Sequence, residues 1–402
     1  MLQRLLGYLD EQHLLPDGQR VLLAVSGGRD SVCLAHLFHS AAIPFAIAHC
    51  NFHLRPGDCD RDQQFVARLA DDYGVPFHTT SFDTHSWATN HHQGIEEAAR
   101  TLRYAFFADL CRKEGYPLVA TAHHADDAIE TFFLNLFRGT GLHGLHGIQP
   151  RTTLATEHDP LTVIRPMLCF TRADIDAYVE SHHLAYVEDS TNSDISLRRN
   201  WLRHRLLPLL REQYPSLDGT MLSTIAHLRH AEELFNQHID LLRSTYLTPY
   251  HSAVPTLPFA IVSVDVEALP EPRTTVLYEL LQPYGFSSPR VDDMLQPHPS
   301  GSLFFSSTHV AEWHRGRLLL APRCEPIPPA VFDDDGGRLH LRRWRSGDRF
   351  RPKGMNGSRL VADYLKDRHI SRIEREHVWL VVDDDDRICA LLGLRDASKT
   401  QK

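Results

Sequence analysis

The first 170 residues alternate short apolar runs with longer segments of helical periodicity. Apolar runs typical of strands cover residues 21–25, 43–49, 75–80 and 117–122, with 163–167 as a candidate fifth. Helix-length segments cover residues 31–40, 60–73, 94–114 and 126–138. In the segment 60–73, Phe65, Val66, Leu69 and Ala70 recur at helical spacing and would bury one stripe. This alternation predicts parallel strands joined by crossover helices, and so a doubly wound, mostly parallel α/β sheet.

The pattern changes after the predicted sheet. Residues 139–150 carry four glycines and predict a flexible turn. A basic helix is expected over 197–210, and an amphipathic helix over 218–247 with Asp218 as its cap. Repeated prolines then interrupt the pattern, so no elements are assigned from about 250 to 330.

Asp333 to Gly337 is typical of a linker, and strand-like patterns follow at 378–382 and 388–394. We therefore expect three domains: a catalytic α/β domain over 1–212, a mainly helical middle domain over 213–332, and a small α+β domain over 333–402.

Composition excludes several classes of protein. The formal net charge is −9, and the seven cysteines include no C-x-x-C pair, which disfavours a disulfide framework and a Cys-rich zinc site. The longest stretch without Asp, Glu, Lys or Arg, residues 31–54, contains four His as well as Ser40, Pro44 and Asn51, and is therefore too polar to span a membrane. Charged residues interrupt the first twenty positions, so we expect no signal peptide, no membrane partner and a cytoplasmic location.

The sharpest chemical signal follows the first predicted strand, where the sequence reads Ser26-Gly-Gly-Arg-Asp-Ser31 before a helix. A strand, two glycines and a helix start bring backbone N–H groups and a positive dipole end to one point, which suits a phosphate. Neither a Walker A loop nor a dinucleotide fingerprint is present. The plainer alternative is a Ser/Gly turn with Asp30 as helix cap.

A second signal follows the strand at 117–122, where Asp126, Asp127 and Glu130 fall on one side of the next predicted helix. Beside a phosphate loop, these carboxylates predict a place for Mg²⁺ or an ammonium group. Simple capping and solvated charge is the alternative. His123 and His124 lack a third ligand at a convincing spacing, so we expect no zinc there.

The S-G-G-x-D-S loop resembles that of the N-type ATP pyrophosphatases (PP-loop enzymes), which cleave ATP between its α and β phosphates. Other motifs resemble the tRNA(Ile)-lysidine synthetase family in particular. They are His123 to Thr131 with Arg138-Gly139-x-Gly141, Ala48 to Arg55, Glu96 to Arg100 with Arg103-Tyr104, Arg165-Pro166, Glu188 to Asp194 with Arg199-Asn200 and Arg203, Gly347 to Pro352, and Gly354-Met355. Leu394-Arg395-Asp396 matches that family only loosely.

The resemblance implies an enzyme that uses ATP and Mg²⁺ to adenylate the C2 oxygen of the wobble cytidine in an isoleucine tRNA. The ε-amine of free L-lysine then displaces AMP, giving lysidine, AMP and pyrophosphate. A homodimer is compatible with the resemblance, and the middle and C-terminal domains would contact tRNA.

The resemblance also implies roles for particular residues. Nucleotide binding falls to Ser26, Gly27, Gly28, Arg29, Asp30, Ser31 and His49, with Asp30 as the Mg²⁺ ligand. The catalytic set is Asp30, Asp126, Asp127, Glu130 and Arg103, and the substrate-binding set is His123, Asp127, Glu130, Arg199 and Arg203. Which carboxylate holds the lysine ammonium and accepts its proton is left open among Asp126, Asp127 and Glu130. Arg29 departs from the usual loop sequence and is expected to point to solvent.

Two basic stretches are candidates for binding phosphate. Residues 195–211 carry five arginines and no acid, which suits RNA phosphates, an ATP phosphate or a lysine carboxylate, but equally a plain solvated face. Residues 338–377 carry twelve Lys or Arg against five Asp or Glu, a net charge of +7, and resemble an RNA-docking surface. Trp344 and Phe350 in that stretch would either stack on bases or belong to the core.

Two rival functions remain at this stage. A tRNA thiolase of the same superfamily would use the same ATP loop, but it needs a cysteine pair that the missing C-x-x-C motif disfavours. A noncatalytic tRNA-binding protein with a degenerate nucleotide fold is disfavoured because Ser26, Asp30 and Asp127 are all present.

Overall fold

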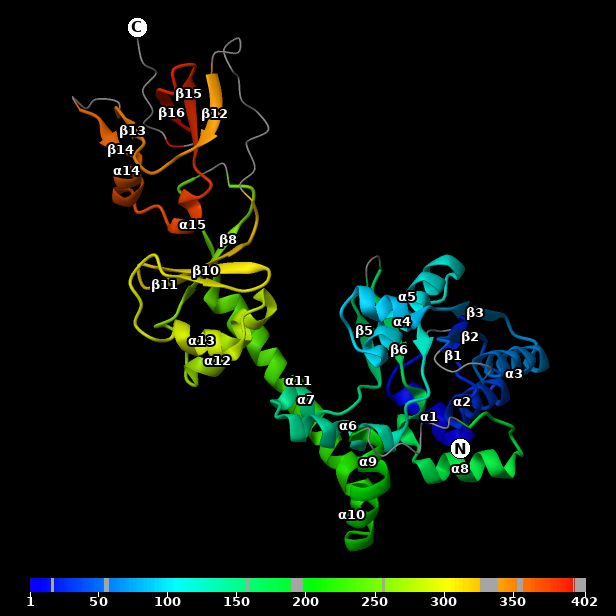
Figure 1. Cartoon of the computed structure of the whole chain (residues 1–402). Helices are drawn as coiled ribbons and strands as arrows, with labels where there is room; N and C mark the ends of the chain where they lie inside the picture. Colours follow the sequence, from blue (N-terminus) through cyan, green and yellow to red (C-terminus); the bar gives the residue numbers. More distant parts are fainter. Residues whose placement is uncertain are drawn as a thin grey trace. The chain divides into compact units, whose positions relative to one another are not determined.

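The computed structural model describes residues 1–15, 18–53, 58–156, 159–188, 198–254, 257–325, 339–352, 357–392 and 394. The chain divides into two compact units, Met1–Glu232 and Glu233–Lys402, whose elements are labelled in Figure 1. No helix among the described residues is both long and apolar enough to cross a membrane. The predicted division into three domains, with boundaries at 212 and 332, stays a prediction.

The first unit is built on a six-stranded sheet. Its spatial order is β3 (Phe77–Ser81), β2 (Phe45–Asn51), β1 (Val21–Ala24), β4 (Val119–Ala120), β6 (Leu161–Ile164) and β5 (Arg151–Leu154). The first five strands run parallel, and β5 pairs antiparallel with β6. The doubly wound, mostly parallel sheet is therefore confirmed. The fifth strand ends earlier than predicted, because Pro166 cannot donate a ladder hydrogen bond and begins a 3₁₀ turn, Pro166–Cys169.

Side chains of the central strands alternate between two buried layers. Val21 and Leu23 pack on one face of the sheet, and Leu22 packs on the other. The first layer is completed by α1 (Leu2–Glu11), α2 (Arg29–Ser40), α3 (Asp58–Tyr73) and α8 (Arg172–Ser181). The second is completed by α5 (Ile95–Glu114), which follows the short α4 (Thr84–Asn90). Burial on both faces explains why these strands are continuously apolar in sequence.

Helices also extend the first unit beyond the sheet. They are α6 (Ala125–Arg138), α7 (Leu142–Leu145), α9 (Arg198–Trp201), a π-helical segment Leu202–Leu206, α10 (Leu207–Gln213) and the part of α11 (Leu217–Tyr246) up to Glu232. The flexible turn predicted over 139–150 is wrong in part, because α7 forms within it. Asp218 is not a cap, since α11 begins at Leu217 and Asp218 lies in its first turn.

The second unit contains an antiparallel sheet that the sequence pattern left unassigned. Its order is β7 (Leu247–Tyr250), β8 (Ile261–Asp265), β11 (Arg317–Pro322), β10 (His309–His314) and β9 (Leu303–Phe305). The helices α12 (Arg273–Leu281) and α13 (Ser288–Met294), with a 3₁₀ turn Gln282–Tyr284 between them, share a buried apolar cluster with this sheet and the C-terminal half of α11. The middle of the chain thus has sheet as well as the expected helix.

The C-terminal part of this unit holds two small sheets and two short helices. One sheet orders β12 (Leu339–Arg343), β15 (Trp379–Asp383) and β16 (Ile388–Leu391), and the other pairs β13 (Arg349–Phe350) with β14 (Arg359–Leu360). The helices are α14 (Val361–Asp367) and α15 (Arg372–Arg375). Phe350 is buried and Trp344 packs against the same cluster, so the core alternative is right for both aromatics.

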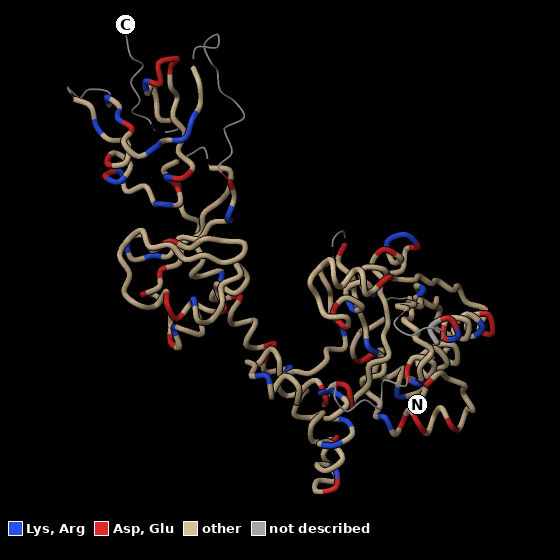
Figure 2. Tube along the Cα trace, in the orientation of Figure 1, with Lys and Arg blue, Asp and Glu red and all other residues tan. Residues whose placement is uncertain are grey.

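Several cations of this region are exposed, and Figure 2 marks Lys and Arg in blue along it. Arg343, Arg345, Arg349, Lys366, Arg368 and Arg372 are exposed. The predicted linker at 333–337, the pair Gly354-Met355 and the segment Arg395-Asp396 lie outside the described residues.

Candidate active site

A cavity of about 1150 Å³ opens where β1 and β4 end. These neighbouring parallel strands connect in opposite directions, β1 to β2 on one side and β4 to β6 on the other. Doubly wound folds bind ligands at such a switch point, beyond the carboxyl ends of the strands. The loop after β1 and the start of α6 after β4 both line the cavity, so the two signals found in the sequence meet in one place.

The loop after β1 has the geometry of an anion cradle. Gly28 is the N-cap of α2, and Gly27 has φ +93°, in the left-handed region that favours glycine. A Cβ on Gly27 would lie 3.3 Å from Val66 Cγ2, so α3 also restricts this position. Ser31 Oγ donates to the Gly28 carbonyl at 2.8 Å and lies 3.3 Å from Ser26 Oγ. Gly28 N–H donates weakly to Ser26 Oγ at 3.3 Å, and the N–H groups in the first turn of α2 have no partner within the helix, which suits a phosphate.

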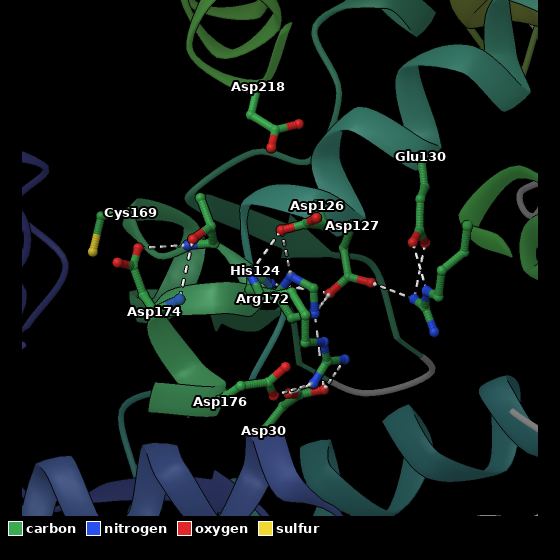
Figure 3. Close-up of polar contacts among 12 residues, drawn as sticks. Asp30, His124, Asp126, Asp127, Glu130, Cys169, Arg172, Asp174, Asp176 and Asp218 are labelled. Atoms are coloured by element: carbon green, nitrogen blue, oxygen red, sulfur yellow. Dashed lines mark hydrogen bonds and ion pairs between the residues drawn. The ribbon is translucent and has the colours of Figure 1, made fainter. Parts of the chain in front are cut away.

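Asp30 is held by an arginine that sequence reasoning missed. Arg172 Nη1 and Nη2 donate to the two Asp30 carboxylate oxygens at 2.5 and 3.1 Å, as Figure 3 shows. The backbone N–H of Arg172 also donates to Asp126 Oδ2 at 2.8 Å. Arg172 is the first residue of α8, whose start is set by a capping box between Thr171 and Asp174. That capping box predicts where α8 begins, but nothing in it predicts the partner of Arg172.

The carboxylates of α6 form a second ionic cluster. Glu130 is fully buried, and its oxygens accept from Arg199 Nε at 2.7 Å and from Arg203 Nε and Nη2 at 2.7 and 3.0 Å. Asp127 Oδ1 accepts from Arg199 Nη2 at 3.0 Å. Burial alone would raise the pKa of Asp127, but the neighbouring His124, Arg199 and His123 outweigh it and hold the pKa below its ordinary value. Burial would lower the pKa of Arg203, yet its bonds to Glu130 raise it.

The basic helix divides into inward and outward arginines. Arg199 and Arg203 bind the carboxylates of α6, and Arg211 binds both Asp126 and Asp218. Arg198 and Arg205 are exposed. A π-helical segment separates α9 from α10, where Pro208 has no N–H for the preceding turn. The stretch is therefore neither a uniform RNA-binding face nor a plain solvated one.

His124 lies at the centre of the acidic groups (Figure 3). It is the N-cap residue of α6, and its side chain is 1% exposed. Its Nε2 is 3.9 Å from Asp30 Oδ2 and 3.5 Å from Asp127 Oδ2, and its Nδ1 is 3.7 Å from Asp126 Oδ2. Neither ring nitrogen makes a hydrogen bond within the described part of the chain. From the sequence, this histidine was recognisable only as a possible metal ligand.

The other predicted residues occupy different parts of the site. His123 lines the cavity, its Nδ1 lies 2.9 Å from Thr121 Oγ1, and burial lowers its pKa to about 4. Arg103 also lines the cavity and packs 5.2 Å from the Phe52 ring centre. His49 is buried behind the loop, with Nδ1 2.9 Å from the Val25 carbonyl.

The expectation that Arg29 points to solvent is wrong. Its guanidinium donates to Asp176 Oδ1 and to the Tyr186 hydroxyl, both at 2.6 Å, and lies over the Tyr186 ring. Arg29 thus links the phosphate loop to α8 and the segment after it. Glu188 lines the cavity, whereas residues 189–194 of the same motif and Leu54-Arg55 lie outside the described residues.

Comparisons with known proteins agree with this geometry. A family model described as "PP-loop domain" matches residues 3–210. Models described as "TilS substrate binding domain" and "TilS substrate C-terminal domain" match residues 260–323 and 339–402.

Three similar proteins carry the name tRNA(Ile)-lysidine synthase. That of Bacteroides thetaiotaomicron is 35% identical over 98% of this chain and 95% of its own. Those of Chlorobaculum tepidum and Geobacter sulfurreducens are 41% identical over 60% of this chain and 72% of theirs, and 29% identical over 96% and 91%. The similarity to the Bacteroides protein therefore extends through both compact units.

Proposed function

The chain belongs to the tRNA(Ile)-lysidine synthase family, and from this we propose that it joins lysine to C2 of the wobble cytidine of an isoleucine tRNA. ATP drives the reaction, and the products are lysidine, AMP and pyrophosphate. The observation that carries the proposal is the meeting, in one cavity, of the Ser26–Ser31 loop with the carboxylates and guanidinium groups of α6 and α8. An anion cradle beside fixed negative charge suits a phosphorylated substrate and an amine together.

In the first step, the C2 oxygen of the cytidine attacks the α-phosphorus of ATP and pyrophosphate leaves. We assign the phosphates to the N–H groups of Gly28 and the first turn of α2, with Ser26 and Ser31 beside them. Arg103 is proposed to bind phosphate or the lysine carboxylate. His49 has an indirect role, because it contacts the Val25 carbonyl immediately before the loop.

The donor set of the cavity fits Mg²⁺. Asp30 and Asp127 supply carboxylate oxygens, the ligands that Mg²⁺ prefers, and both approach the same His124 nitrogen. We propose Asp30 as the main ligand, oriented by its two bonds to Arg172. When bound, the ion would neutralise charge that develops on the phosphates.

In the second step, the lysine ε-amine attacks C2 and AMP leaves. All three carboxylates of α6 contact arginines, but Glu130 and Asp126 are buried, whereas Asp127 is only partly buried and lines the cavity. We therefore propose that Asp127 pairs with the ammonium group, and that Glu130 and Asp126 act as positioning residues. Because the pKa of Asp127 is lowered, it is a weak base. The ammonium must lose one proton before the nitrogen lone pair can attack C2, and the nitrogen loses a second proton once the carbon–nitrogen bond has formed and AMP has left. His123 lines the same cavity and is proposed to contact the substrate.

We propose that the exposed cations of the second unit contact the tRNA backbone, with the wobble base taken from the single-stranded anticodon loop. Unstacking such a base requires less free energy than unstacking one in a duplex. Since this substrate is a tRNA, we propose that the protein acts in the cytoplasm. A homodimer stays a prediction.

The test incubates the full chain with ATP, Mg²⁺, radiolabelled lysine and an isoleucine tRNA that has cytidine at the wobble position. We expect label in the RNA, with AMP and pyrophosphate released in equal amounts. A tRNA carrying uridine at that position is the matched control and should stay unlabelled. Sulfur transfer in place of lysine incorporation would favour a thiolase, and tRNA binding without ATP cleavage would favour a noncatalytic protein.

A further inference from the structure

A second cluster of polar side chains lies outside the cavity, at the end of the first unit. His143 belongs to α7, His146 immediately follows it, and Glu232 lies on α11. The short helix is fastened to α6, because Asn135 Nδ2 donates to the Gly144 carbonyl at 2.8 Å. Figure 1 shows α7 beside α11. The cluster joins residues that lie 89 and 86 positions apart in the chain.

The two imidazoles share one carboxylate. His143 Nδ1 is 2.6 Å from Glu232 Oε1, and His146 Nδ1 makes a still shorter contact with Oε2. Gln149 Nε2 also lies 2.8 Å from His146 Nδ1. A ring nitrogen that donates to Glu232 cannot also accept from Gln149, so hydrogen bonds alone satisfy this group of atoms poorly. Glu232 is buried, and although burial would raise its pKa, both histidines hold that pKa below its ordinary value.

We propose that His143, His146 and Glu232 bind a zinc ion that ties α7 to α11. Their donor atoms all lie within 4.8 Å of one another, and these are the only three residues in the described part of the chain that gather in this way. Tetrahedral zinc with bonds of about 2.1 Å separates its ligand atoms by about 3.4 Å, so the two contacts between imidazole and carboxylate have to lengthen by about 1 Å. Two imidazoles and one carboxylate are a known zinc ligand set.

The exposure of the cluster decides what completes the coordination. The His143 side chain is 88% exposed, whereas those of His146 and Glu232 are 12% and 8% exposed. The fourth position is therefore open to water, on the His143 side. Binding requires that neither Nδ1 atom carries a proton, so each neutral ring has its proton on Nε2. The Arg229 side chain, one turn earlier on α11, donates to the Ile148 carbonyl.

The experiment uses the full chain, stripped with a chelator and dialysed, and measures zinc uptake by calorimetry and by elemental analysis after gel filtration. Wild type is expected to bind one zinc ion more than Glu232→Gln or His146→Ala, whose affinity at this site falls about 100-fold or more. The matched controls are Glu233→Gln and His230→Ala, exposed neighbours on the same helix, and they should behave as wild type. A cobalt-loaded sample should show a tetrahedral d–d absorption that only the first two variants lose.

His143→Ala keeps the test decisive if the buried variants fail to fold, since its exposed side chain contributes little to packing. It should lose the same zinc ion while its circular dichroism spectrum stays unchanged. Equal zinc content in wild type and His143→Ala would overturn the proposal. A wild-type protein that retains no zinc would also overturn the proposal, and the three residues would then form only a hydrogen-bonded cluster.

Discussion

Glu130 offers the sharpest test of how the cavity is held together. Its carboxylate is fully buried and receives three hydrogen bonds, from Arg199 and Arg203. The substitution Glu130→Gln keeps the shape, removes the charge and turns an amide N–H₂ group toward a guanidinium donor. Arg199 and Arg203 then keep only Asp127 as a counter-charge on α6.

The expected cost follows from this geometry. Removing one partner of a buried ion pair costs about 3–5 kcal/mol, and the partial exposure of Arg199 and Arg203, 40% and 26%, favours the lower end. About 3 kcal/mol, divided by an unfolding entropy of about 0.5 kcal/mol/K for a unit that spans Met1–Glu232, lowers the melting temperature of the first unit by about 6 °C. Scanning calorimetry of the full chain measures this directly.

A double-mutant cycle separates the ion pair from general damage. Arg203→Gln alone leaves Glu130 with Arg199, and the double variant removes both members of one pair, so its cost should fall below the sum of the single costs by about 1–2 kcal/mol. Glu97→Gln, at an exposed position on α5, is the control and should change stability by less than about 0.5 kcal/mol. Strict additivity, or a melting temperature of Glu130→Gln within 1 °C of wild type, would refute the reasoning.

Three further predictions follow from the site. Because burial lowers the pKa of His123 to about 4 from an ordinary value near 6.5, the folded state loses up to about 3 kcal/mol as the pH falls from 6.5 to 4. His123→Asn should remove most of that loss, as measured by the free energy of urea unfolding at pH 7 and at pH 4.5. An equal loss of stability between the two pH values in wild type and variant would contradict the lowered pKa of His123. Gly27→Ala should lower the free energy of unfolding by about 1–3 kcal/mol and raise the KM for ATP, because φ is +93° and Val66 is close. Gly28→Ala, at φ −70°, should lower the free energy of unfolding by less in denaturant titrations. Equal effects of the two substitutions would argue against the cradle geometry. Asp30→Asn should abolish AMP formation while filter binding of tRNA persists, and retained turnover would remove Asp30 from its proposed role.

Local patterns predicted the centre of the site well. The loop after β1 and the acidic start of α6 each depend on a strand, a turn and a helix that are adjacent in sequence, and the parallel sheet then brings them together. The side on which Asp126, Asp127 and Glu130 lie follows from helical spacing alone.

Partners that are distant in sequence were not predictable. Arg172 binds Asp30 across 142 residues, and nothing in the helix-start signal of α8 indicates that contact. His124 directly precedes the predicted helix start, but its approach to three carboxylates depends on packing of α2 and α8. Glu232 and the two histidines of the zinc proposal are separated in the same way.

The secondary structure in the middle of the chain could not be predicted for a different reason. Its strands are three to six residues long, and prolines interrupt the segments between them, so neither period 2 nor period 3.6 extends far enough to be recognised. Only the long α11 kept a clear periodicity.

The link from Arg211 to Asp126 and Asp218 has a consequence for anyone who cuts this chain into pieces. A fragment that stops at residue 210, where the first matched region ends, omits the guanidinium that holds Asp126. It also loses Ile225 from the apolar cluster that packs on Ala128 and Ile129 of α6. A recombinant N-terminal piece should therefore run to the end of α11 at Tyr246, so that its acidic groups keep their native partners.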